Sequence, residues 1–299
     1  FKVLDTTVSN SKLEIKNVQD VEIDISGELI GPIDNLFKYS NSGSLTDISS
    51  ENLSKLNGLT KTDFQIKIPL KGKKIKLWSN IKLENVSFDF DTQNNISNIN
   101  GHLYYKNEKF FTEENSPLTA IFDRNNVSMN LDTLNNGDFI LFGEQKIQNE
   151  NIISNPIFKK RILGNSSWDY KINIPGFRSI TKVIHVQANS TLNGTSISFP
   201  RPFKKEKNIN SRIFIESNYA DKEFNNISVL YNNIRVEIKS LKSLNGYINF
   251  SGERIKIPDN RIDIFGKISE FDINEWKLIR ENSTSTDYLQ YINNINIDF

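Results

Sequence analysis

Apolar and polar residues alternate with a period of two along most of this chain. The pattern is clearest at residues 21–25, 64–70, 86–90 and 234–238, where Val, Ile, Leu or Phe alternate mainly with charged or polar residues. Successive side chains of a strand point to opposite faces of a sheet. Each segment therefore predicts a strand with one face withdrawn from water and one charged face.

Turn signals separate these segments. Asn-Asn and Asn-Gly pairs occur at residues 94–95, 136–137 and 232–233. The strands recur roughly every 8 to 12 residues, which favours an antiparallel meander over βαβ units. We therefore predict a mainly β fold: a long, curved antiparallel sheet that forms an open groove of repeating β-units, with a few short helices.

Two segments carry helical patterns. The first is a helical crossing at residues 33–58, and the second is a helix at 273–280. Asp272 or Asn274 could cap the second helix. We expect Trp276 to pack that helix on the sheet.

Both helical segments follow a strand that ends in a glycine-containing element, which suggests a long internal repeat. We predict a first β-groove unit at residues 1–150, which includes the crossing at 33–58. The second unit would cover 151–299 and include the helix at 273–280. Together they would form one continuous, elongated domain that is a fragment of a longer protein.

The charges of the chain nearly cancel, because 37 Lys and Arg residues face 36 Asp and Glu residues among 299. This balance gives no reason to expect nucleic acid as a partner. Short basic clusters lie at residues 71–76 and 204–207. We predict that both are solvated loops, with lipid headgroups or a protein partner as the alternative. Lys204, Lys205 and Lys207 should lie in water at a rim.

Candidate chemistry is sparse. The chain has no Cys, which excludes disulfides, thiolate metal sites and a Cys nucleophile. His102 and His185 lack the spacing of metal ligands. No nucleophile elbow or phosphate-binding glycine loop is present, and acidic pairs occupy turns or the polar positions of strands. We predict no enzyme activity, no metal and no cofactor.

No apolar run is long enough to cross a bilayer as a helix. Phe1 is not a start residue, and a strand pattern begins at once. We expect an internal segment whose membrane anchor, if it has one, lies outside this chain.

The apolar side of the predicted strands could pack in a β-sandwich or line a groove filled by lipid acyl chains. Alternation alone does not separate these two possibilities. Long strands and few helices favour the groove. Its predicted lining residues are Val21, Ile23, Ile25, Phe64, Ile66, Ile68, Val86, Phe88, Phe90, Ile172, Ile174, Ile197, Phe199, Ile234, Val236 and Ile238.

Residues 166–216 resemble the characteristic block of the YhdP proteins, large AsmA-like proteins of the bacterial envelope. In that block a Trp-bearing strand leads to Leu-x-Gly, an alternating strand and Pro-x-Pro. The element GKISEFDINEW at 266–276 is similar to a second family element, and residues 64–105 are a looser match. The matching block positions here are Trp168, Tyr170, Ile172, Ile174, Leu192, Gly194, Ile197, Phe199, Pro200, Pro202, Phe203 and Lys204.

The resemblance implies a bridge-like lipid transfer protein in the periplasm, anchored to the inner membrane by a segment outside this chain. It would move phospholipid between the inner and outer membranes without catalysis. Its partners would be phospholipid acyl chains and membrane components at the ends of the full-length protein. A scaffold for outer-membrane biogenesis without lipid conduction is the alternative. A third possibility is an adhesin or a parallel β-helix enzyme that acts on polysaccharide. A β-helix would need short repeats of about 20 to 25 residues, which are not evident.

Overall fold

A computed structural model describes most of the 299-residue chain. The residues it describes are 2–3, 5–16, 21–35, 56–71, 74–89, 95–122, 125–149, 153, 156–176, 179, 182–221, 223–240, 245–259, 261–272, 274–277 and 292–298.

The predicted fold class is confirmed: the protein is mainly β, with an open sheet and a few short helices. The helix α4 covers Pro156–Arg161. The strands are β1 (Lys2–Val3), β2 (Thr6–Lys16), β3 (Glu22–Pro32), β4 (Leu56–Pro69), β5 (Lys76–Asp89), β6 (Asn95–Lys106), β7 (Lys109–Phe111), β8 (Leu118–Phe122), β9 (Asn125–Thr133), β10 (Phe139–Gln148), β11 (Ile162–Ile174), β12 (Ile184–Ser190), β13 (Thr195–Ile197), β14 (Ile213–Ala220), β15 (Glu223–Tyr231), β16 (Ile234–Ser240), β17 (Asn245–Asn249), β18 (Ile262–Lys267) and β19 (Ile292–Asp298).

The chain forms two compact units. Unit 1 comprises residues 1–143 and 173–182, and unit 2 comprises 144–172 and 183–299. The internal repeat and the single elongated domain remain predictions.

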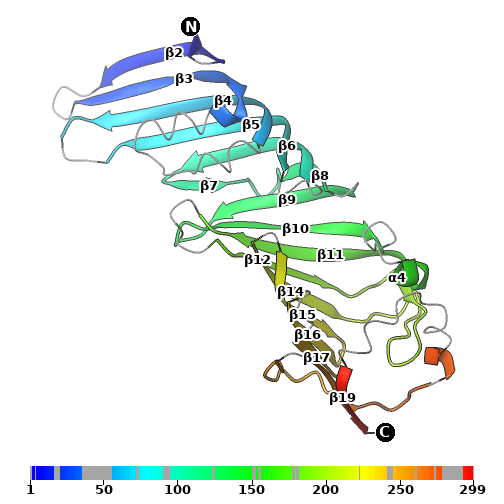
Figure 1. Ribbon diagram of the computed structural model, residues 1–299. Coiled ribbons are helices and arrows are strands. Elements are labelled where there is room, and N and C mark those ends of the chain that lie inside the picture. Colours follow the sequence, from blue (N-terminus) through cyan, green and yellow to red (C-terminus); the bar gives the residue numbers. More distant parts are fainter. Residues whose placement is uncertain are drawn as a thin grey trace. The chain divides into compact units, whose positions relative to one another are not determined.

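Unit 1 is an antiparallel meander in which β2, β3, β4, β5 and β6 pair in chain order (Figure 1). Next to β6, the short strands β7 and β8 take the place of one interrupted strand, since both pair with β6. β8 then pairs with β9, and β9 with β10. The alternating residues 23–25, 64–68 and 86–88 therefore belong to three successive strands of this meander, β3, β4 and β5.

Asparagine residues mark the places where the strand register shifts. Asn10, Asn85 and Asn226 have φ angles of 52°, 51° and 51°, and each lies in an irregularity of its strand pair. Each adds one residue to one strand of its pair, which is a β-bulge. Asn tolerates this left-handed backbone conformation better than most non-glycine residues. The bulges thus let long strands stay paired while their apolar residues remain on one face.

Asn85 offers a test of this explanation. Val has a higher strand propensity than Asn, but the left-handed conformation costs L-residues about 1–2 kcal/mol. We expect Asn85→Val to lower the free energy of unfolding by about that amount, and Asn85→Gly to leave it nearly unchanged. Urea unfolding followed by circular dichroism measures both. A valine variant as stable as the parent would show that the bulge does not depend on residue 85.

Unit 2 is a mixed sheet. Strands β12, β14, β15, β16 and β17 pair antiparallel, as expected. The pairs β17–β18 and β18–β19 are parallel, which departs from the expected meander. Parallel neighbours require a connection that crosses back over a face of the sheet. Residues 250–259 and 261 are the described part of this crossing between β17 and β18.

The predicted helices are only partly described. Residues 33–35 are helical, residues 36–55 lie outside the described part, and residues 56–58 belong to β4 rather than to the helical crossing. In the second segment, 274–277 form a helical turn, while 273 and 278–280 lie outside the described part. Asp272 is the cap, because its Oδ1 accepts hydrogen bonds from the backbone N–H groups of Asn274 and Glu275 at 2.9 and 3.1 Å.

Residues 191–212 leave the sheet between two neighbouring strands. β12 pairs directly with β14, with Ser190 opposite Ile213. In between, the chain turns and adds β13 to β11, which places Thr195 opposite Gly164. At Gly194 (φ 91°), an added Cβ would lie 2.3 Å from the carbonyl oxygen of Asn165. The glycine of the Leu-x-Gly motif is therefore required by backbone contact.

Replacing Gly194 should destabilise the fold by more than the cost of placing an L-residue at its positive φ angle. We expect Gly194→Ala to lower the free energy of unfolding by at least about 2 kcal/mol, because the methyl group would collide with rigid backbone. Gly137→Ala is the matched control, since its φ is 87° but no atom lies within 4 Å of the added Cβ. It should cost about 1 kcal/mol in the same urea titration. Equal losses would exclude the collision as the cause.

Candidate functional site

The apolar side chains of unit 1 form continuous rows across neighbouring strands, which we call the apolar face. One row joins Leu13, Ile25, Ile66 and Leu77 on β2, β3, β4 and β5. A second row joins Ile15, Ile23 and Ile68. Paired residues of antiparallel strands point to the same face, so the alternation in sequence becomes one two-dimensional apolar surface.

This apolar face is open toward one end of the strands. Leu13 is 63% exposed, Ile15 is 70% exposed, and Leu70, just after β4, is 59% exposed. Toward the opposite end the same face is closed, since Ile81 and Leu83 are buried. Val86, Leu118, Ala120, Val127 and Met129 are buried as well. Unit 1 therefore has both a packed core and an exposed apolar surface.

The structure brings together most of the predicted lining residues of unit 1. Ile23 lies opposite Ile68, and Ile25 lies opposite Ile66. Phe64 is in the next row, where it contacts the Gly27 position. Val21 precedes β3, and its carbonyl oxygen accepts a hydrogen bond from the Leu70 N–H at 3.0 Å. Beyond the Asn85 bulge, Val86 pairs with Ile99 and Phe88 with Ile96. Phe90 lies outside the described residues.

The sheet of unit 2 has an apolar face of its own, which contains a comparable row of side chains. Val236 lies between Val229 and Ile248, and Ile238 lies opposite Ile227. These predicted lining residues are half-buried. Ile234 is 6% exposed and belongs to a packed cluster instead.

Protein side chains fill one end of this face. Trp168, Leu192, Tyr231 and Ile234 form the buried cluster, and Ile197 and Phe203 pack against it. Leu192, Ile197 and Phe203 come from the excursion between β12 and β14. This part of unit 2 is a closed core.

The remaining predicted lining residues lie near this core or on β11. Phe199 is buried. The centroid of its ring lies 5.1 Å from the ring centroid of Phe158 and 6.3 Å from that of Trp276. Trp276 thus packs its helical turn against the Pro-x-Pro segment, and its Nε1 donates to the Arg201 carbonyl at 3.3 Å. Ile172 and Ile174 are half-buried on β11.

The opposite side of the unit 1 sheet carries ion pairs, and we call it the charged face. Asp24 is nearly buried and accepts hydrogen bonds from Lys16 Nζ and Gln65 Nε2, both at 2.9 Å. Lys61 Nζ lies 2.7 Å from Glu28 Oε2. The hydrogen bond from Lys16, followed by that from Gln65, lowers the pKa of Asp24. In turn, the hydrogen bonds that Lys16 donates to Asp24 and, with a smaller effect, to Glu14 raise the pKa of Lys16 to about 12.

These shifts predict how stability responds to acid. The pKa of Asp24 in the folded state lies below the ordinary value of 3.8. The Asp24 carboxylate therefore contributes fully to the free energy of unfolding above pH 3.8, and this contribution is lost as the pH falls through the folded-state pKa. We expect Asp24→Asn to reduce stability at neutral pH and to weaken its decline in acid. Urea midpoints measured from about pH 6 down to about pH 3 test this. Asp221→Asn, in an exposed turn, should keep the parent's acid profile.

Unit 2 also has a charged side of its sheet, which residues 250–259 of the crossing cover. Glu237 is 7% exposed, and its Oε1 accepts hydrogen bonds from Ser228 Oγ at 2.8 Å and from Arg254 Nε at 3.0 Å. Arg254 also pairs with Glu216. The Tyr247 hydroxyl accepts the Ile255 N–H at 2.9 Å. These polar contacts give the crossing a fixed position on the sheet.

One residue of the basic cluster at 204–207 is not where the sequence predicted it. Lys204 and Lys207 are exposed, as expected. Lys205 is only 5% exposed, and its Nζ donates to the carbonyl oxygens of Thr195 and Glu206 at 2.6 and 3.0 Å. Burial lowers the pKa of Lys205. The rim assignment was therefore wrong for Lys205, whose ammonium group joins the later part of the excursion to β13 in its earlier part.

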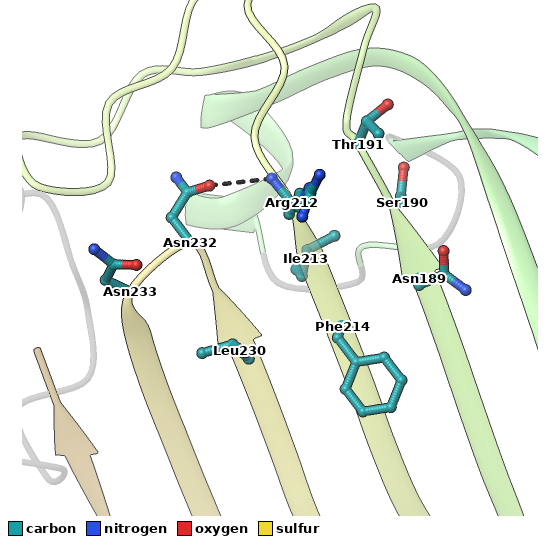
Figure 2. A pocket seen from close by; sticks show the side chains of 9 residues that line it. All are labelled: Asn189, Ser190, Thr191, Arg212, Ile213, Phe214, Leu230, Asn232 and Asn233. Atoms are coloured by element: carbon teal, nitrogen blue, oxygen red, sulfur yellow. Dashed lines mark hydrogen bonds between the residues drawn. The ribbon is translucent and has the colours of Figure 1, made fainter. Parts of the chain in front are cut away.

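A depression of about 530 Å³ lies where β12, β14 and β15 meet the excursion (Figure 2). Asn189, Phe214 and Leu230 share one face there, by strand register. Asn232 Oδ1 accepts the Arg212 N–H at 3.0 Å and holds the turn. The mixture of amide, hydroxyl and apolar groups contains no pair suited to acid–base chemistry.

The two histidines have structural partners. His102 Nδ1 lies 2.9 Å from Asn80 Oδ1, and His185 Nδ1 lies 2.6 Å from Asn218 Oδ1. Within the described ranges, no group of three or more His, Asp or Glu residues is placed to hold a metal ion. Among those same residues, no helix has the length and hydropathy needed to cross a membrane.

A scan against protein-family models matches residues 2–297 to the family described as "YhdP protein". The chain belongs to the YhdP family. No curated protein and no solved structure matched the chain in the corresponding searches. In this YhdP chain the motif residues serve packing: Leu192 and Trp168 are core, Gly194 permits the close backbone approach, and Phe199 contacts Trp276.

Proposed function

We propose that this YhdP chain binds phospholipid acyl chains on its apolar face and contributes to phospholipid transport between the inner and outer membranes. The process needs no catalytic residue. The protein would act in the periplasm, with a membrane anchor supplied outside this chain. The observation that carries the proposal is the exposed apolar row of unit 1, which includes Leu13 and Ile15.

Acyl chains suit this surface physically. Each methylene group withdrawn from water contributes about 0.8 kcal/mol, which is sufficient in sum to hold a lipid. The contacts are non-directional, so an acyl chain can move from one row to the next without breaking specific bonds. The charged face of the same sheet stays compatible with water through its ion pairs.

Membership in the YhdP family supports the envelope setting of this proposal. In unit 2 the half-buried row through Val229, Val236 and Ile248 would offer acyl chains a second apolar surface. The predicted lining residues that are buried in cores, Val86, Phe199 and Ile234, would support this surface from within.

A scaffold for outer-membrane biogenesis is the second candidate. The observation that favours it is the cluster of Trp168, Leu192, Tyr231 and Ile234, where protein side chains occupy the apolar face of unit 2. A scaffold would close its remaining apolar surface against protein. It would not carry phospholipid.

The two candidates differ in bound lipid. Phospholipid extracted from the purified 299-residue chain and quantified by mass spectrometry should be present for the parent. Ile25→Asp should reduce the amount about fivefold or more, because a charge in the acyl-chain surface must be desolvated. Leu13→Asp should act in the same direction with less effect on folding, since Leu13 is more exposed.

Ser26→Asp is the matched control. It adds the same charge one residue away, on the charged face opposite Lys12, and should leave bound lipid unchanged. Circular dichroism of each variant checks that it is folded. Folded Ile25→Asp and Leu13→Asp variants that keep their full lipid load would contradict the assigned face, and a parent without phospholipid would favour the scaffold.

A further inference from the structure

Lysines gather at one end of the unit 1 strands, where Glu22 pairs with one of them, Lys67. At the end where β4 passes to β5, the basic rim consists of Lys67, Lys71, Lys74, Lys76 and Lys106. Lys67 lies opposite Lys76, in the row of Asp24 on the charged face, and Lys106 lies opposite Trp78, two residues farther along β5. Lys71 and Lys74 lie in the connection between β4 and β5. Toward the other strand ends, the described residues Asp5, Asp34, Glu84 and Asp89 are acidic, and Lys2 and Lys82 are basic.

Three lysines of the basic rim are free to meet a ligand. Lys71, Lys74 and Lys76 are exposed, and none of them pairs with a carboxylate in the described part of the chain. The lysines farther along the sheet differ, since Lys16 pairs with Asp24 and Lys61 pairs with Glu28. Lys16 and Lys61 thus have carboxylate partners on neighbouring strands. Among the described residues, the positive charges of Lys71, Lys74 and Lys76 have no such partner.

The open part of the apolar face ends at the same rim. Leu70 continues the alternation of Phe64, Ile66 and Ile68, and Ile75 continues that of Leu77. Leu70 and Ile75 are 59% and 60% exposed. Aliphatic side chains beside lysines whose ammonium groups reach water are a combination typical of the boundary between acyl chains and headgroups.

We propose that the basic rim binds the phosphate of anionic phospholipid headgroups while the acyl chains lie on the apolar face of unit 1. This inference rests on the proposed function and adds a lipid class to it. A zwitterionic headgroup also contains a phosphate, but its own cation opposes the lysines. The chain should therefore select anionic over zwitterionic phospholipid, and the preference should weaken as salt screens the charges.

The experiment is a competition for lipid. The 299-residue chain is incubated at low salt with vesicles of equal parts phosphatidylglycerol and phosphatidylcholine, then re-isolated, and both bound lipids are quantified by mass spectrometry. Phosphatidylglycerol should be enriched about tenfold or more, since each lysine near an anionic headgroup contributes roughly fivefold in affinity. The variant K71Q/K74Q/K76Q should bring the ratio to within about twofold of the vesicles while total bound lipid persists.

The variant K159Q/K160Q/K239Q is the matched control, because it removes the same charge from exposed lysines of unit 2. It should keep the enrichment. Millimolar inorganic phosphate should not displace the lipid, because phosphate lacks acyl chains. Displacement would identify a free-phosphate site and overturn the lipid assignment.

The possible failures are distinguishable. Bound phospholipid without enrichment in the parent would overturn the basic-rim inference and leave the proposed function intact. Enrichment that survives in K71Q/K74Q/K76Q, or that is lost equally in the control variant, would also overturn it. Absence of both phospholipids from the parent would overturn the inference together with the proposed function.

Discussion

The register between neighbouring strands is the constraint on which the rest of this structure depends. It aligns Leu13, Ile25, Ile66 and Leu77 into one row, although each comes from a different strand. A slip of one residue would move every side chain of a strand to the other face. Asparagines such as Asn85 absorb extra residues in a left-handed conformation, so long strands can stay in phase.

The apolar face of a sheet is normally either covered by other parts of the protein or exposed as a binding surface. Covered and exposed apolar surfaces both occur in this protein. In unit 2 the excursion after β12 brings Leu192 and Phe203 onto the sheet, and Lys205 secures that excursion by donating to the buried Thr195 carbonyl oxygen. In unit 1 the apolar face stays exposed at Leu13 and Ile15. Unit 1 by itself combines a packed core, which includes Val86 and Leu118, with this exposed surface.

Much of the fold could be predicted because it depends on local patterns. The alternation predicted the strands, and the asparagine pair after Tyr231 predicted the hairpin turn between β15 and β16. Asp272 was one of two candidate caps and is the one used. The parallel strands β18 and β19 could not be predicted, because parallel pairing depends on how a connection crosses the sheet.

By itself, the sequence determined the strands, the two chemically distinct faces and the motif shared with the YhdP family. Only the tertiary structure decided which apolar residues are open and which are enclosed. Ile25 and Ile234 both belong to alternating segments, yet the first lies opposite the exposed Leu13 and the second lies within a cluster with Trp168 and Leu192. Alternation specifies the side of a sheet on which a residue lies, whereas its burial depends on contacts between residues far apart in the chain.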